Sequence, residues 1–352
     1  MSTTWTLKKN PKYKETRLWV WARESWLGQA VRGCRRCRRE FRRCRREFWA
    51  WAQCENVAPS NVQQLAESIA AIPVRALDSA TENSDTEAPI FLLSTSQRAG
   101  STLLQRILVT DSRVLLWGEP LSQAGLISRI TEAVSAPVHP LNLELWRNQG
   151  KPASSSLPTS WIGLLHPPGD DFRLALRSFF DRWLGESARE LGFTRWGFKE
   201  IRLGATEATL LHWLYPNAKF IILSRHPYDC YRSLADAIDV GELFDYDHPT
   251  GICIDSAVRF ARYWNRIAVS WSQLPAGFPF VFIRYEDLIS GKFDFRKLES
   301  WLGIEIRENV ALSVSLGGTA KRSRLNWYER LIIDREATAG MQALGYSKHI
   351  DK

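Results

Sequence analysis

The chain has 352 residues, a formal net charge of +9 and an apolar content of 45%. This length leaves room for one large α/β domain with appendages, and the composition is that of a soluble globular protein. Because the longest apolar runs are short and the N-terminus lacks an uninterrupted apolar core, we expect neither a membrane-spanning helix nor a secretory signal, and we predict a cytoplasmic protein.

Basic residues are concentrated in residues 1–58, which hold fifteen Lys and Arg against five Glu, a net charge of +10. The rest of the chain holds 32 basic and 33 acidic residues, so its net charge is −1. The tail repeats the phrase R-R-C-R-R-E-F at 35–41 and 42–48, and its apolar residues recur in alternating steps of three and four from Leu27 to Trp51. We predict one long helix over residues 16–53.

The partner of this predicted helix stays open. Nine arginines lie between Arg32 and Arg46, with tryptophans on either side. Such a helix can lie peripherally on an anionic membrane surface, pair with a partner helix or with a second copy of itself, or remain solvated. Nucleic acid is less favoured because no further base-reading motif accompanies the arginines. Cys34 and Cys37 have zinc-like spacing, but the second C-x-x-C is missing, so we expect reduced thiols in the apolar seam and no metal.

A short helix and a linker follow the tail. Ser60 and Gln63 form a capping box that starts a helix ending at Ala71. Residues 77–88 are acidic, rich in Ser and Thr and without periodicity, which is typical of a linker. The predicted division is a basic tail, a connecting segment and a catalytic domain: 1–58, 59–88 and 89–352.

The folded domain opens with a strand, a polar loop and a helix. Ile90–Leu93 is a continuous apolar run of the kind found in strands buried on both faces, and Ser94–Thr102 interrupts it. Apolar residues then recur at helical spacing from Leu103 to Leu108. The backbone N–H groups of such a loop and of the helix N-terminus point to one spot beyond the strand, which favours an anion and above all phosphate.

This loop lacks the lysine of the common nucleotide-triphosphate motif G-x-x-x-x-G-K-[ST]. Gly100 is followed by Ser101, and the cation Arg98 comes two residues before the glycine. This order resembles the 5′-phosphosulfate loop of sulfotransferases that use 3′-phosphoadenosine 5′-phosphosulfate (PAPS). The resemblance implies that Arg98 bears on the bridging oxygen of the donor, and that the loop residues bind the donor: Gln97, Arg98, Ala99, Gly100, Ser101 and Thr102. The alternative is an ordinary strand-turn-helix with a solvated arginine.

A second segment resembles the same family. Lys219–Ser224 reads as another buried strand, and Arg225, Pro227 and Ser233 follow it at the spacing of the family's 3′-phosphate site. A guanidinium suits a phosphate dianion because it can donate two parallel hydrogen bonds. The alternative is a charged strand end with Pro227 at the first helical position.

Two further residues are candidates for the chemistry. Glu119 follows a predicted strand at 114–117, and a carboxylate there can accept the proton of an incoming hydroxyl group. The resemblance to the tyrosine-protein type of sulfotransferase implies this role; a turn residue or a helix N-terminal charge is the alternative. Lys199 ends a strand at 196–198, and the resemblance places it in contact with the transferred group, although a structural lysine is also open.

The other predicted elements complete an α/β pattern. Asp170 or Asp171 is expected to cap a helix that extends to Leu184. Arg284–Leu288 is a phrase common in sulfotransferases, with a structural role as often as a catalytic one, and Lys321 and Arg322 resemble part of the family's last basic loop. The remaining expected elements are a loop region at 135–169, helices at 205–215, 255–271, 295–302 and 341–346, and a strand at 280–283.

The resemblance covers residues 89–346 and implies a P-loop NTPase-like α/β fold, with a mainly parallel sheet and helices on both faces. It implies in-line transfer of a sulfuryl group from PAPS to a hydroxyl group, or an amine, of a carbohydrate, lipid or peptide acceptor. Glu119 would be the base, with Arg98 and Lys199 stabilising charge. Two alternatives stay open. One is a nucleotide-dependent kinase, which should prefer ATP and show an acidic magnesium site; the other is a non-catalytic protein that binds a membrane or a partner through the arginine helix.

Overall fold

The computed structural model describes residues 62–71, 88–120, 124–135, 169–239, 254–307, 309 and 325–347. All of them lie in the unit that spans Glu55–Lys352. The predicted tail helix, most of the acidic linker, residues 136–168 of the expected loop region, and the basic loop with Lys321 and Arg322 lie outside the described residues.

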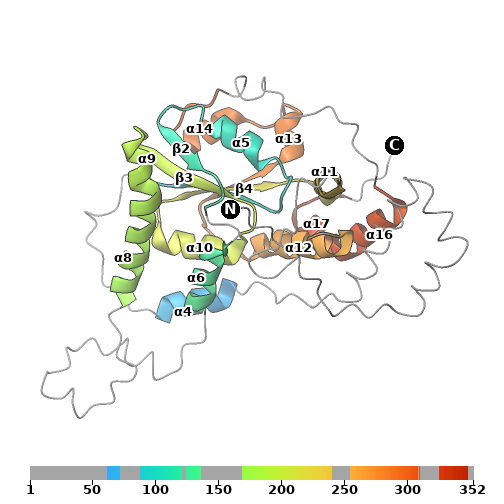
Figure 1. Ribbon diagram of the computed structural model, residues 1–352, viewed down its shortest axis with the longest axis horizontal. Helices are drawn as coiled ribbons and strands as arrows, with labels where there is room; N and C mark the ends of the chain where they lie inside the picture. Colours follow the sequence, from blue (N-terminus) through green and yellow to red (C-terminus); the bar gives the residue numbers. More distant parts are fainter. Residues whose placement is uncertain are drawn as a thin grey trace, which may run out of the picture. The chain divides into compact units, whose positions relative to one another are not determined.

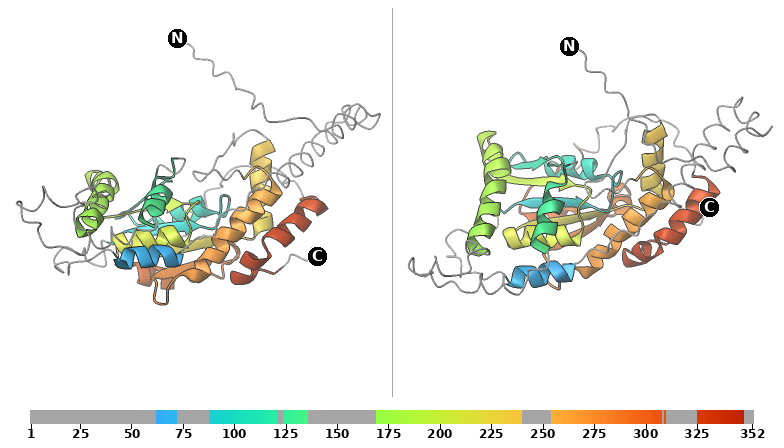
Figure 2. Two further views of the ribbon diagram at one scale, coloured as in Figure 1. Left: turned by 90° about the horizontal axis from the view of Figure 1, so that it is seen from below. Right: turned by 60° about the horizontal axis from the view of Figure 1, so that its bottom comes forward.

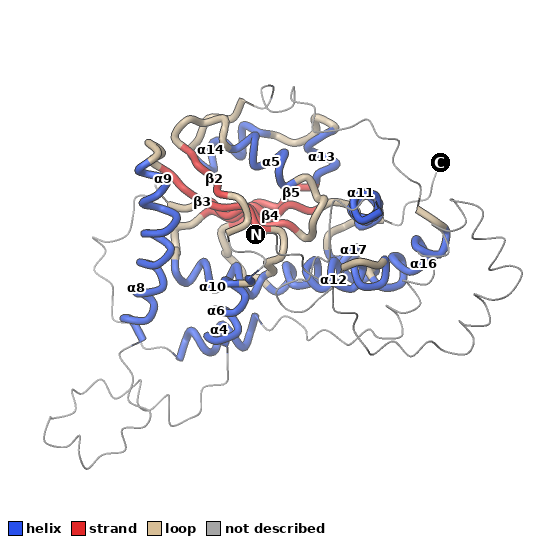
Figure 3. Tube along the Cα trace, in the orientation of Figure 1, coloured by secondary structure: helices blue, strands red, loops and turns tan. Residues whose placement is uncertain are grey.

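A parallel sheet lies at the centre of the fold (Figures 1 and 3). Its five strands are β1 (Ile90–Ser94), β2 (Val114–Trp117), β3 (Arg195–Glu200), β4 (Lys219–Ser224) and β5 (Phe280–Arg284). Their order is β2-β3-β1-β4-β5, so the strand that precedes the predicted phosphate loop is the central one. The predicted α/β fold with a parallel sheet is confirmed, and the strands were all expected from their apolar runs.

Within the described ranges, three short helices cover one face of the sheet. They are α5 (Ser101–Leu108), α13 (Tyr285–Ile289) and α14 (Phe295–Leu302). Because side chains alternate along a strand, Leu92 and its register partner Ile221 both point to this face, where they pack with Leu104. The predicted end of α14 is confirmed, since Gly303 adopts a left-handed φ of 70° there.

The opposite face carries a larger layer of helices. They are α4 (Val62–Ala71), α6 (Leu126–Ser135), α10 (Ala205–Leu214), α11 (Pro227–Asp239), α12 (Ala257–Ser270), α16 (Trp327–Glu336) and α17 (Thr338–Ala343). The core under them is aromatic, with the ring of Phe91 4.7 Å from Phe198 and 5.2 Å from Phe220. Figure 2 shows α16 and α17, in red, running beside α12, in orange. The predicted helix ending at Ala71 is confirmed as α4, whose Leu65 belongs to this core.

The helix expected from about Asp170 to Leu184 starts earlier and continues further than predicted. It begins at Gly169 as α8 (Gly169–Phe180), passes through a π-helical turn (Asp181–Glu186) and ends as α9 (Ser187–Glu190). The start before Asp170 corrects the predicted cap. In the π-helical turn the carbonyl of Leu184 accepts a hydrogen bond from Nε1 of Trp117 at 3.0 Å, which ties this helix to β2.

Gly197 allows β3 to lie close against β1. A Cβ at this position would come within 1.9 Å of the carbonyl oxygen of Ile90 and 2.6 Å of Cδ2 of Leu116. A side chain would therefore separate the two strands. Since Lys199 lies two residues further along β3, this contact also sets the position of a candidate site residue. Among the helices in the described ranges, none is both long and apolar enough to cross a lipid bilayer.

Candidate active site

The candidate residues gather at one edge of the sheet. Since all five strands run in the same direction, their carboxyl ends meet at this edge, where open α/β sheets bind their ligands. In chain order, the groups found there are the loop 95–100 after β1, Glu119 after β2, Lys199 and Glu200 at the end of β3, Arg225 after β4 and Tyr285 after β5.

The loop after β1 has the backbone shape of an anion-binding loop. Arg98 and Gly100 both adopt positive φ angles, 61° and 92°, and the carbonyl of Gly100 accepts hydrogen bonds from the N–H groups of the first turn of α5. The N–H of Thr95 donates to the carbonyl of Leu223 at 3.0 Å, which fixes the loop to β4. Ser101 is buried, whereas the side chains of Arg98 and Thr102 are exposed at the mouth of the loop.

The two predicted phosphate-binding segments touch each other. Nη1 of Arg225 donates a hydrogen bond of 3.0 Å to the carbonyl oxygen of Arg98. Arg225 is buried, and its Nε has no hydrogen-bond partner among the described residues. A buried guanidinium with a hydrogen-bond donor still to be used suits an anionic ligand.

The ring of Tyr285 packs against both of these segments. Its ring lies 4.4 Å from the guanidinium carbon of Arg225, a cation–π contact. The same ring leaves no room for a side chain at Gly100, since a Cβ there would come within 2.2 Å of Cδ2 of Tyr285. Gly100 is thus required both by its φ angle and by the approach of this ring.

The segment that contains Tyr285 is itself anchored. Glu286 accepts a hydrogen bond from the N–H of His226 at 2.8 Å and another from the hydroxyl of Tyr346 at 3.2 Å. Arg284 donates to the carbonyl of Leu344 at 2.8 Å. Residues Arg284–Leu288 therefore connect the ends of β4 and β5 to the C-terminal segment through hydrogen bonds. This role is structural.

Glu119 and Lys199, the predicted base and the predicted lysine, form an ion pair. Nζ of Lys199 donates to Oε1 of Glu119, and Nη1 of Arg202 donates to Oε2 of the same carboxylate at 2.7 Å. That nitrogen of Arg202 also lies 3.2 Å from Oε1 of Glu200. Two carboxylates and two cations thus form one network at the end of β3.

The two carboxyl groups of this network differ in their pKa. Burial raises the pKa of Glu200 to about 7, despite the opposing charge of Arg202. Burial acts in the same direction on Glu119, but the charges and hydrogen bonds of Lys199 and Arg202 outweigh it and hold the pKa of Glu119 below its ordinary value. Glu119 is therefore ionised at neutral pH, whereas Glu200 is only partly ionised there.

A comparison with models of known protein families identifies the family of this chain. Residues 89–308 match the model of the sulfotransferase family, and they include β1 to β5 with the loop after β1, Glu119, Lys199, Glu200, Arg202, Arg225 and Tyr285. The chain belongs to the sulfotransferase family. No similar sequence was found among curated proteins.

Solved structures similar to this family member are also sulfotransferases. A sulfotransferase domain from the curacin biosynthetic pathway has a TM-score of 0.41 and 18% identity, with 75% of this chain and 99% of that chain covered. A sulfotransferase domain from the olefin synthase of Synechococcus PCC 7002 has a TM-score of 0.39 and 15% identity over 78% and 99%. A sulfotransferase from Alicyclobacillus acidocaldarius has a TM-score of 0.39 and 15% identity over 73% and 94%.

The structure places the other predicted site residues of this sulfotransferase family member as follows. Ser233 lies in α11, half-buried and about two helical turns after Arg225. Gln97 and Ala99 are buried within the loop. The structure does not describe Lys321 or Arg322. In the described ranges, no group of three or more His, Cys, Asp and Glu side chains is arranged to hold a metal ion.

Arg202 was missed by the sequence reasoning. It is buried and contacts the candidate base, but it follows β3 in a segment that was read only as far as Glu200. The signal that could have found it is the phrase Lys-Glu-x-Arg at the end of a buried strand, because charges there need partners on neighbouring strands.

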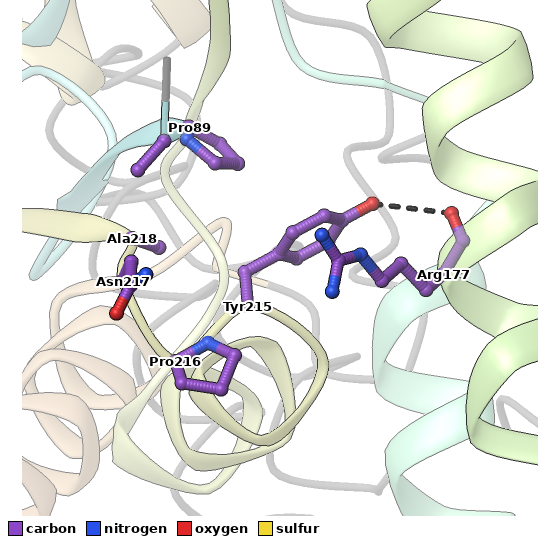
Figure 4. Close-up of a pocket in the computed structure, with 7 residues that line it drawn as sticks. Pro89, Arg177, Tyr215, Pro216, Asn217 and Ala218 are labelled. Atoms are coloured by element: carbon purple, nitrogen blue, oxygen red, sulfur yellow. Dashed lines mark hydrogen bonds between the residues drawn. The ribbon is translucent and has the colours of Figure 1, made fainter. Parts of the chain in front are cut away.

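Among the described residues, cavities lie near two edges of the sheet. One adjoins the ion network and is lined by Pro120, residues 125–128 of the α6 segment, Glu200, Arg202 and Leu203. The other lies at the opposite edge, where Pro89 precedes β1 and Ala218 precedes β4 (Figure 4). In the second cavity the hydroxyl of Tyr215 donates to the carbonyl of Arg177 at 3.2 Å. The first cavity is the one close to the candidate base.

Proposed function

We propose that this protein transfers a sulfuryl group from PAPS to a hydroxyl group of an acceptor. The observation that carries the proposal is the hydrogen bond from Arg225 to the carbonyl of Arg98, because it joins the two segments predicted to bind phosphate groups, at the ends of the neighbouring strands β1 and β4. PAPS carries phosphate groups on both sides of its ribose, and two adjacent anion sites match that arrangement.

The donor would be held at both phosphate groups. The backbone N–H groups of residues 97–102, with the hydroxyl groups of Ser101 and Thr102, would bind the 5′-phosphosulfate. Arg225 would bind the 3′-phosphate through its remaining donors, with Ser233 beside it. Tyr285 would hold the guanidinium plane of Arg225 in place.

The chemical step would be an in-line transfer. The bond between sulfur and the bridging oxygen of the 5′-phosphate breaks while the acceptor oxygen bonds to sulfur, and the acceptor proton passes to Glu119. The products are a sulfate ester and 3′-phosphoadenosine 5′-phosphate (PAP). Arg98 would stabilise charge on the leaving bridging oxygen, and Lys199 charge on the sulfuryl oxygens.

The ion pair between Lys199 and Glu119 has a consequence for this step. A carboxylate held by two cations is a weak base, because both cations favour its ionised form. If Lys199 turns towards the sulfuryl group, Glu119 loses one of these cations and its pKa rises. Binding of the donor would therefore make Glu119 a stronger base.

Nucleotide selectivity tests the donor assignment. PAP should stabilise the full-length protein against thermal unfolding, by about 2.7 kcal/mol at 100 times its Kd, and well above any effect of ATP or AMP. Arg225→Ala should abolish this difference, because the 3′-phosphate is what distinguishes PAP from AMP. Arg182→Ala, which changes an arginine that is 79% exposed on the π-helical turn, is the matched control.

Thermal unfolding of the three proteins with each nucleotide gives the answer. Equal stabilisation by PAP, ATP and AMP would contradict the proposal, and stabilisation by ATP alone would favour a kinase. The acceptor would then be sought with radiolabelled PAPS and a panel of oligosaccharides, lipids, phenols, amines and tyrosine peptides.

A further inference from the structure

Arg202 links the candidate base to the rest of the fold. Its side chain is only 2% exposed, and its Nη1 lies 2.7 Å from Oε2 of Glu119 and 3.2 Å from Oε1 of Glu200. The two carboxylates come from different strands, since Glu119 follows β2 and Glu200 ends β3. One guanidinium therefore joins the ends of two neighbouring strands at the position of the base.

The two oxygens of Glu119 have different partners. Oε1 accepts from Lys199, and Oε2 accepts from Arg202. Lysine has a flexible stem and a single charged nitrogen, whereas the planar guanidinium of arginine has a fixed orientation. Of the two cations, Arg202 is thus the one better suited to hold the carboxylate while Lys199 engages the donor.

The backbone that carries Arg202 is held on both sides. The N–H of Ile201 donates to Oε1 of Glu200 at 2.8 Å, and the carbonyl of Ile201 accepts from the hydroxyl of Tyr263 in α12 at 3.1 Å. Tyr263 is itself buried in the core. The segment Glu200–Arg202 is therefore fixed to a long helix, as a support for a catalytic group requires.

We propose that Arg202 is a positioning residue for the reaction: it holds Glu119 through Oε2, so that Oε1 takes the acceptor proton once Lys199 turns to the donor. This inference rests on the proposed function, because it takes Glu119 to be the base. The opposite pKa changes of the two carboxyl groups support it, since the charge of Arg202 is balanced mainly by Glu119 when Glu200 is protonated.

Substitutions at position 202 separate the charge from the geometry. Arg202→Lys keeps the charge but loses the planar guanidinium, so we expect kcat to fall by about 10- to 100-fold with little change in the KM for PAPS. Arg202→Met removes the charge, so we expect the pKa of Glu119 to rise. PAP should stabilise both variants as it does the unchanged protein, because Arg202 lies outside the proposed donor-binding segments.

The pKa is measured by NMR on the full-length protein labelled with ¹³C at the glutamate carboxyl carbons, and it needs no acceptor. The Glu119 signal is identified as the one lost in Glu119→Gln. If Arg202→Met does not fold, the double variant Arg202→Met/Glu200→Gln is used instead. It also removes the buried carboxylate of Glu200, which loses its partner when Arg202 is replaced. Arg182→Met is the control at an exposed arginine.

The outcomes distinguish the inference from the proposed function. An unchanged pKa of Glu119 in Arg202→Met, or full kcat in Arg202→Lys with the acceptor identified from the panel, would overturn the role of Arg202. Full activity of Glu119→Gln would instead overturn the role of Glu119 as base. A raised pKa in Arg202→Met shows that the two groups interact, and a reduced kcat in Arg202→Lys with unchanged stability and PAP binding supports the positioning role, because an arginine that only stabilised the fold or only supplied charge would leave that rate unchanged.

Discussion

Glu119→Gln is expected to lower kcat by about 10²- to 10⁴-fold, the usual contribution of a general base. Glutamine has almost the same shape as glutamate but cannot take the acceptor proton. Since Glu119 contacts Lys199 and Arg202 rather than the loop after β1, PAP binding should be nearly unchanged. The measurement is the initial rate at saturating PAPS with the acceptor found in the panel, together with the Kd for PAP.

The control for this variant is Glu305→Gln, which changes a glutamate whose side chain is 76% exposed and should leave the rate unchanged. The pH profile gives a second readout. Because Lys199 and Arg202 lower the pKa of Glu119 in the enzyme without donor, kcat/KM for PAPS should stay high as pH falls towards the ordinary glutamate pKa of about 4.3 and decline only below it. An unchanged kcat in Glu119→Gln would mean that Glu119 is a turn residue and that another group takes the proton.

Gly100→Ala is expected to lower the affinity for PAP by about 100-fold, which corresponds to ~2.7 kcal/mol. The added methyl group would lie 2.2 Å from Cδ2 and 2.4 Å from Cε2 of Tyr285, so the ring or the loop must move. The ring cannot move alone, because it packs on the guanidinium of Arg225. Calorimetric titration with PAP would show the loss.

Gly291→Ala is a matched control for this substitution. Gly291 also has a positive φ angle, 70°, but a Cβ there would have no neighbour within 4 Å. Both variants therefore have the cost of alanine in a left-handed conformation, about 1–2 kcal/mol, but only Gly100→Ala disturbs the proposed donor site. Equal PAP affinity in the two variants would show that Tyr285 and Gly100 do not shape that site.

The strands were predictable because each is a short apolar run that ends in polar residues. Among the described helices, α6, α13 and α16 were not predicted, and α17 starts and ends before the helix predicted at 341–346. In α16, Trp327 and Leu331 are 77% and 61% exposed while Glu329 is buried, so the apolar spacing does not mark the inner face. In α6, Ser128 and Thr131 occupy buried positions. The hydrophobic period is weak in α16 for this reason, whereas α6 has a clear amphipathic period that the sequence reasoning overlooked.

The individual residues of the candidate site were predictable from the sequence, but the contacts between their side chains were not. Family resemblance indicated Arg98, Glu119, Lys199 and Arg225 one by one. The ion pair between Glu119 and Lys199 depends on β2 and β3 being neighbours, and the order of strands in a parallel sheet is set by packing of the whole chain. The network around Arg202 follows from that same pairing.

A crystal structure of the full-length protein with PAP tests the central claim most directly. We predict that the 5′-phosphate lies within hydrogen-bonding distance of the backbone N–H groups of residues 97–102, and that the 3′-phosphate lies against the guanidinium of Arg225. PAP bound at another edge of the sheet, or bound at this edge without contact to Arg225, would contradict the proposed donor site.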